Sequence, residues 1–119
     1  MPVSHRPAGN HLLADFYGVE AARLLDPAQI DAMLRAAALA AGARILHSHF
    51  HSFGKGLGVT GVLLLAESHI SIHTWPEFGF AAADIFMCGE AQPQLALDVI
   101  EMALQAGARE VKTILRGAS

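Results

Sequence analysis

The chain has 119 residues, 53% of them hydrophobic, and a formal net charge of −3. This length fits one small domain, and its longest apolar stretches, residues 36–43 and 59–66, fall short of the roughly 18–20 residues that cross a bilayer. The absence of a basic cluster argues against a nucleic-acid partner. The single cysteine, Cys88, excludes an intrachain disulfide. No apolar segment follows Met1–Arg6, which predicts no signal peptide and a cytoplasmic location.

Hydrophobic periodicity predicts eight elements in the order β-α-β-β-β-β-α-β. A helix is expected to begin at Pro27, with Asp26 as its N-cap, and to end at Gly42. A second helix is expected at residues 92–105, and strands at residues 10–17, 44–53, 59–67, 68–74, 80–88 and 110–115. This order predicts an α+β fold, a two-layer sandwich in which two helices cover one face of a largely antiparallel sheet. The uncovered face predicts a dimer paired sheet to sheet, an αββα arrangement.

The densest group of reactive side chains is the segment Glu67-Ser68-His69-Ile70-Ser71-Ile72-His73-Thr74-Trp75-Pro76-Glu77. Polar groups at the end of a buried strand are costly to place unless they do chemistry or bind a ligand. A serine hydroxyl can attack the carbonyl before it when the peptide is strained and proton carriers are near. Attack by Ser68 on Glu67 would give an ester, and loss of the serine α-proton would then expel the Glu67 carboxylate. Hydrolysis of the resulting dehydroalanine leaves a pyruvoyl group.

This segment resembles the prokaryotic S-adenosylmethionine decarboxylases. The likeness extends upstream and downstream over about residues 9–107, through residues 9–13, 41–43, 50–53, 58–62, 79–84 and 86–89. The resemblance implies scission between Glu67 and Ser68, giving residues 1–67 (β chain) and 68–119 (α chain). It implies that Ser68 becomes the pyruvoyl cofactor, with no external cofactor. It also implies a homodimer of processed protomers, with pockets at or near the subunit contact.

The resemblance assigns further roles residue by residue. The His73 position is linked to proton removal during ester breakdown, and the Cys88 position to proton donation during turnover. The Trp75 and Glu77 positions flank the substrate pocket, and the Phe53 position matches an aromatic that stacks on adenine. Aromatic faces suit a sulfonium cation and a flat base, and a carboxylate suits ribose hydroxyls. The implied reaction converts S-adenosylmethionine to the aminopropyl donor of spermidine synthesis.

Thr60 departs from the family pattern, because relatives often have serine at that position. The hydroxyl is kept, so a hydrogen bond used in maturation can survive the added methyl group.

Two other functions remain open. One is a pyruvoyl-dependent arginine or ornithine decarboxylase with the same Ser68 chemistry. The other is a ligand-binding or metal-binding module that never cleaves itself. Taken singly, Cys88 and His73 would be structural residues, and it is their joint spacing with Trp75 and Glu77 that favours an enzyme.

A histidine triplet, His47, His49 and His51, occupies alternate positions of one expected strand, and so one face of it. No carboxylate or thiol neighbours the triplet in sequence, so we expect no metal there. His51 is expected to line the pocket, and His47 and His49 to form hydrogen bonds near the dimer interface.

Overall fold

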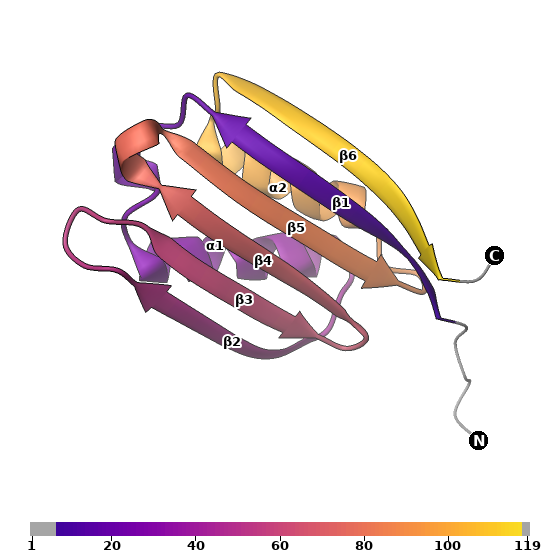
Figure 1. The fold of residues 1–119 in the computed structure, drawn as a ribbon. Coiled ribbons are helices and arrows are strands. Elements are labelled where there is room, and N and C mark those ends of the chain that lie inside the picture. The colour runs from indigo at the N-terminus through magenta and orange to yellow at the C-terminus, as the bar shows by residue number, and fades with distance from the viewer. Residues whose placement is uncertain (1–6, 118–119) are drawn as a thin grey trace.

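The computed structural model describes residues 7–117, and the N-terminal segment Met1–Arg6 lies outside that range. The described residues have the expected α+β architecture (Figure 1). The strands are β1 (Ala8–Tyr17), β2 (Ile45–Ser52), β3 (Val59–Leu65), β4 (Ser68–Trp75), β5 (Phe80–Cys88) and β6 (Ala108–Gly117). The helices are α1 (Pro27–Ala40) and α2 (Pro93–Leu104), and short 3-10 turns lie at Ala21–Arg23 and Pro76–Phe78. Neither α-helix of this range is long and apolar enough to span a bilayer.

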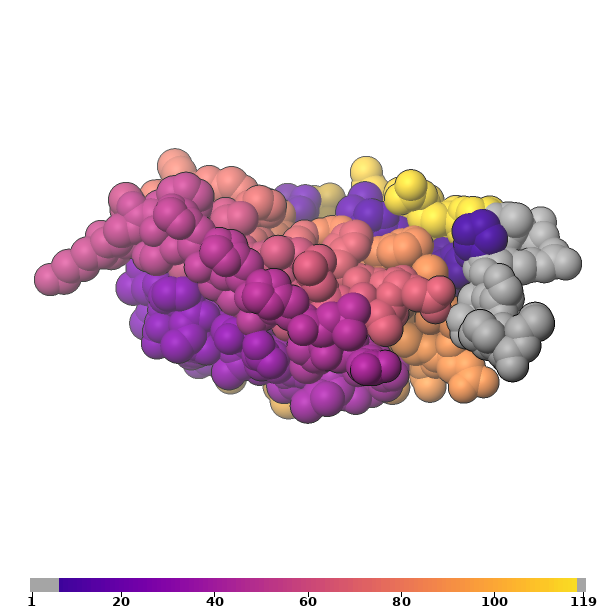
Figure 2. All heavy atoms as spheres, turned by 90° about the horizontal axis from the view of Figure 1, so that it is seen from below, coloured from indigo at the N-terminus to yellow at the C-terminus, as the bar shows by residue number. Residues whose placement is uncertain are grey.

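The six strands form one sheet in the order β2-β3-β4-β5-β1-β6, and every pairing in it is antiparallel. Both helices lie behind one face of the sheet (Figure 1). In Figure 2, turned by 90°, α1 lies in purple along the lower side of the strand layer. The other face has no helix over it within residues 7–117, and we call it the open face.

Alternation along the strands divides the side chains between the core and the open face. On β5, Ala81, Ala83, Ile85 and Met87 are buried, whereas the residues between them are partly exposed. The helices complete the core with apolar residues at helical spacing: Ile30, Met33, Leu34, Ala37 and Ala38 on α1, and Ala96, Leu97, Ile100 and Leu104 on α2. Each fully buried leucine or isoleucine contributes about 1.5–3 kcal/mol, so this layer supplies the main driving force of folding.

The start of α1 follows the expected capping pattern. The Asp26 carboxylate accepts a hydrogen bond from the Ala28 N–H at 2.9 Å, and Pro27 occupies the first helical position. Pro27 has no N–H and its fixed φ suits a first turn, so the Asp-Pro pair defines where the helix begins.

One expected boundary is wrong, and it lies at the segment of greatest interest. The strand expected over residues 59–67 ends at Leu65, because Ala66 and Glu67 form a two-residue turn and Leu65 pairs with Ser68. Glu67 takes a φ of 60° in this turn. Such turns favour glycine or asparagine, and neither is present, so the apolar run gave no sign that the chain reverses here.

The buried hydroxyl of Thr74 connects three segments and provides a test of the packing. It accepts a hydrogen bond from the Val59 N–H at 2.8 Å and donates one to the Leu24 carbonyl at 2.9 Å. We expect Thr74→Val to lower the free energy of unfolding by about 1–3 kcal/mol, because two buried backbone groups lose their partner. Urea denaturation in a Ser68→Ala background, which keeps the chain uncut, measures the loss. Thr74→Ser is the matched control, and an equal loss in it would mean that the methyl group, not the hydroxyl, matters.

Candidate active site

The Glu67–Ser68 peptide lies in the turn between β3 and β4, at one end of the sheet. Glu67 is one of two non-glycine residues with positive φ in the described chain. A side chain in this left-handed region costs about 1–2 kcal/mol. The Ser68 hydroxyl accepts a hydrogen bond from the Cys88 N–H at 3.3 Å, which fixes it beside the end of β5. A strained peptide and an anchored hydroxyl therefore occupy the same turn.

We call the end of the sheet that contains this turn the scission end. A shallow cavity of about 300 Å³ opens there. Three loops line it: residues 42–44, residues 66–68 and residues 88–91. The cavity brings the predicted cleavage residues Glu67 and Ser68 together with Cys88, although Cys88 follows 20 residues later in the chain.

The Cys88 thiol is held in its protonated form by its surroundings. Burial raises its pKa, and the nearby Glu67 carboxylate raises it further by disfavouring a second negative charge. A thiol with a raised pKa carries its proton at neutral pH, so it can donate that proton to a carbon or an oxygen. This supports the general-acid role expected for Cys88.

The aromatic candidates gather at the opposite end of the sheet. Phe53, His73, Trp75 and Glu77 line a cavity of about 380 Å³, which we call the aromatic pocket, and Thr60 also lines it. Trp75 and the 3-10 turn that follows it bring Glu77 to the rim of the pocket. The expected grouping of Phe53, Trp75 and Glu77 is therefore present in the structure.

Thr60 contacts His73 across the β3–β4 pair. Its Oγ1 lies 3.1 Å from His73 Nδ1, and the two residues are paired in the strand register. The hydroxyl retained at this position thus makes a hydrogen bond to the predicted proton carrier.

The two ends are far apart within one chain. Ser68 and His73 are separated by five residues of extended β4, which corresponds to about 16 Å at the usual rise of a strand. His73 of one chain therefore cannot take a proton from Ser68 of the same chain while β4 is intact.

The histidine triplet lies on the open face of β2. The three histidines are exposed. Their partners on β3 alternate with the buried residues of that strand, which places the histidines on the open face. The pairs are His47 with Leu64, His49 with Val62 and His51 with Thr60. The expectation that they share one face is confirmed. The His51 ring packs edge-on against Phe53 with centroids 4.8 Å apart, which places it near the aromatic pocket without lining it.

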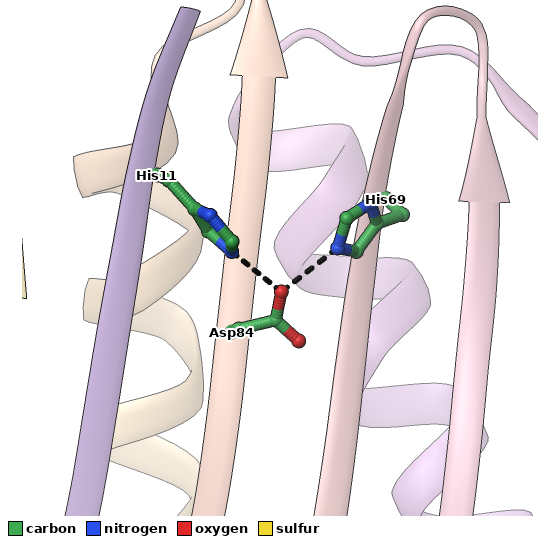
Figure 3. A group of neighbouring side chains, drawn as sticks. All are labelled: His11, His69 and Asp84. Carbon is green, nitrogen blue, oxygen red and sulfur yellow. Dashed lines mark hydrogen bonds and ion pairs between the residues drawn. The ribbon is translucent and has the colours of Figure 1, made fainter. Parts of the chain in front are cut away.

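A polar cluster that the sequence analysis missed lies on the open face near the hairpin between β3 and β4 (Figure 3). His11 of β1 and His69 of β4 both point their Nε2 atoms at Asp84 Oδ2 of β5, at 2.7 and 2.8 Å. Ser71 donates to the other oxygen of Asp84. The sequence signal for this cluster is Asp84, a single carboxylate within the apolar strand 80–88. The sequence does not indicate its partner His11, which lies 73 residues away.

The same three residues offer a donor set that divalent metals use, with all ligand atoms within 4.8 Å of one another. The contact between Arg116 Nη1 and His11 Nδ1, at 3.1 Å, argues against that use. A guanidinium can only donate, so Nδ1 of His11 is unprotonated and its proton is on Nε2, where a metal would bind. The arrangement is a hydrogen-bonded network, which we call the Asp84 network: Asp84, His11, His69, Ser71 and Arg116.

Comparison with known proteins now decides the family. The family model described as S-adenosylmethionine decarboxylase matches residues 10–117. The chain belongs to the S-adenosylmethionine decarboxylase family. The resemblance seen in segment 67–77 thus extends over nearly the whole chain.

Individual relatives agree with this membership. An S-adenosylmethionine decarboxylase proenzyme of Methanococcus maripaludis is 44% identical over 110 residues, covering 92% of this chain and 89% of that protein. A proenzyme of the same name from Acidithiobacillus ferrooxidans is 42% identical over 114 residues, with 94% and 84% covered. The crystal structure of the adenosylmethionine decarboxylase from Aquifex aeolicus superposes with a TM-score of 0.87 at 37% identity, over 96% of this chain and 94% of that one. The α+β fold expected from the family is therefore confirmed.

The state of the Cys88 thiol can be tested by alkylation in a Ser68→Ala background. Its raised pKa predicts slower reaction with iodoacetamide at pH 8 than a free cysteine shows, because only the thiolate reacts. Glu67→Gln removes one cause of the shift, lowers the pKa, and should speed alkylation by roughly twofold. Glu90→Gln, which changes another carboxylate of the same cavity, is the control. Equal rates in all three proteins would show that Glu67 does not act on the thiol.

Proposed function

We propose that this chain is a self-processing, pyruvoyl-dependent decarboxylase of S-adenosylmethionine. The observation that carries the proposal is the turn at Glu67 and Ser68, where a left-handed non-glycine residue precedes a serine anchored beside Cys88. Relatives named as proenzymes support a precursor that must be processed.

Scission proceeds through the atoms of the turn itself. Ser68 Oγ attacks the Glu67 carbonyl carbon, the C–N bond breaks, and Glu67 is left in an ester with the serine oxygen while Ser68 gains a free amine. A base removes the Ser68 α-proton, the Cβ–Oγ bond breaks, and Glu67 leaves as a carboxylate. Water then replaces the amine of residue 68, ammonia departs, and a ketone remains at the new chain end. The strain at Glu67 is released when the first bond breaks, which favours the forward step.

Formed from Ser68, a pyruvoyl group would supply a carbonyl for the substrate amine and an electron sink for the loss of carbon dioxide. Cys88 lies beside residue 68 with its proton held on sulfur, so it can return a proton to the substrate α-carbon.

A second copy of the chain would complete the site. Because about 16 Å of strand separates Ser68 from His73, the His73 that assists scission must come from another chain. Two open faces stacked with their strands running in opposite directions place the scission end of one copy over the aromatic pocket of the other. The open face carries partly exposed Leu13, Leu64 and Ile114, which such stacking would bury.

The same stacking would bring Phe53, Trp75 and Glu77 of the second copy to the substrate. The two aromatic faces of this pocket, Phe53 and Trp75, suit adenine and the sulfonium cation, and its carboxylate, Glu77, suits the ribose hydroxyls. This favours S-adenosylmethionine over the basic amino acids as substrate, with the product serving as aminopropyl donor for spermidine synthesis. The cytoplasmic location and the absence of a nucleic-acid partner remain predictions.

Mass spectrometry of the intact protein tests the proposed processing. We expect purified wild-type material to give two pieces, residues 1–67 and 68–119, the second blocked to Edman sequencing and reactive toward phenylhydrazine. Ser68→Ala should remain one chain and lose all turnover, because no hydroxyl is available for the first step. Cys88→Ala should lose more turnover than scission, since its proton is needed after the ketone exists.

If an aged wild-type sample stays in one piece and does not react with phenylhydrazine, the enzyme hypothesis is excluded. The remaining hypothesis is then a binding module that does not cleave itself. A cleaved, ketone-bearing protein that releases carbon dioxide from arginine or ornithine instead of S-adenosylmethionine would overturn the substrate assignment alone.

Co-expression of two inactive precursors tests the shared site. His73→Ala chains and Ser68→Ala chains should each stay uncut when expressed alone. When both are expressed in equal amounts with different tags, about half of the His73→Ala chains should be cut, because random pairing puts half of them opposite an intact His73. A His73→Ala chain that is cut at the native rate by itself, or never cut in the mixture, would show that His73 does not act across two copies.

A further inference from the structure

We propose that the Asp84 network is a positioning device that holds the chain end created by scission. The inference rests on the proposed function, because that end exists only after the Glu67–Ser68 bond breaks. It assigns a catalytic positioning role to His69, Asp84 and His11, which lie outside the residues that react.

Scission turns the first residue of an interior strand into a chain terminus. Before scission, Ser68 is bonded to Glu67, and afterwards the only covalent attachment of residue 68 is to the later residues of β4. Backbone pairing provides part of the restraint, since His69 pairs with Leu64 on β3 and with Phe86 on β5. Chain ends fray unless they are tied down, and the reactive carbonyl would share that motion.

The side chains of β4 supply the second restraint. His69 is the first residue after the new terminus, and its Nε2 donates to Asp84 Oδ2 at 2.8 Å. Ser71, on the same face two residues later, donates to Asp84 Oδ1. The two oxygens of one carboxylate thus hold the first two open-face side chains of β4, and Figure 3 shows the contact of His69.

The carboxylate is in turn oriented from the other side of β5. Arg116 donates to Nδ1 of His11, so the His11 proton lies on Nε2 and is donated to Asp84 at 2.7 Å. His11 belongs to the piece 1–67, whereas Asp84 and His69 belong to the piece 68–119. The network therefore joins the two products of scission next to the new terminus.

The network also forms a wall of the space in which Cys88 acts. A cavity of about 500 Å³ on the open face is lined by His11, His69, Phe86, Cys88 and Arg116, together with Pro7 and Gly117. The carbonyl at residue 68 and the thiol of Cys88 must keep a fixed separation, because a misplacement of about 1 Å can cost 10²-fold in rate. His69 and Asp84 are partly buried, with 37% and 23% of their side chains exposed, which strengthens hydrogen bonds to the charged carboxylate.

Asp84→Asn is the principal test, because it keeps the shape and removes the charge that accepts from both histidines. Scission of the precursor should stay within about threefold of wild type, whereas kcat of the processed enzyme should fall by about 10–100-fold with a smaller change in KM. Amide hydrogen exchange of residues 69–72 in the processed protein should speed up by a similar factor. Asp98→Asn, the same change at an exposed position of α2, is the control.

Variants of His69 keep the test decisive if Asp84→Asn folds poorly. In the His69→Gln variant the side-chain amide can still donate a hydrogen bond to Asp84, so kcat should be largely retained. The His69→Leu variant has no side-chain donor and should lose as much kcat as Asp84→Asn. Equal activity and equal exchange in His69→Leu and Asp98→Asn would overturn the proposal. Zinc binding by the processed wild type that Asp84→Asn abolishes would also overturn it, because it would require a different tautomer of His11.

The two proposals fail in different ways. If wild-type protein is never cut and never reacts with phenylhydrazine, the proposed function fails. If wild type is cut and active but the network variants match the control, only the positioning role fails.

Discussion

Strand β4 is hydrogen-bonded to β3 on one side and β5 on the other, and this double pairing fixes the place of nearly every candidate residue. A shift of one residue would move each side chain to the opposite face of the sheet. In the observed register Ser68 lies at the end of β5 beside Cys88, while His73 lies opposite Thr60 and Ala82. The same register brings His69 and Ser71 to Asp84. The chemistry proposed for this chain depends on that alignment.

The open face contrasts with the covered face in composition as well as in exposure. The covered face is almost entirely apolar and packs on α1 and α2. The open face mixes histidines, a carboxylate and aromatic rings with leucines, and it carries the Asp84 network and the aromatic pocket. A surface of this kind is too polar for a hydrophobic core and more apolar than a face that contacts only water. This mixture of side chains is the reason for the proposed pairing with a second sheet.

The fold was predictable because its signals are local. The Asp26-Pro27 start of α1 and the strand over residues 80–88 each depend on neighbouring residues, and both are found in the structure. Segment 67–77 likewise indicates the family through eleven consecutive residues. Two features could not be predicted from such patterns. The left-handed Glu67 is imposed by the hairpin against the preference of its side chain, and the Asp84 network depends on strand neighbours that are distant in sequence.

The order of the strands has a consequence for the processing proposed for this chain. Residues 1–67 supply β2, β3 and β1, and residues 68–119 supply β4, β5 and β6, so in the sheet β4 and β5 lie between β3 and β1. Each piece alone keeps one strand pair, β2–β3 or β4–β5, and one strand, β1 or β6, that has no neighbour from the same piece. The intact precursor folds as a single molecule, but two severed pieces must find each other, and their reassembly depends on concentration. The proposed cut would thus make refolding a reaction between two molecules, which is harder to repeat after unfolding than the folding of one chain.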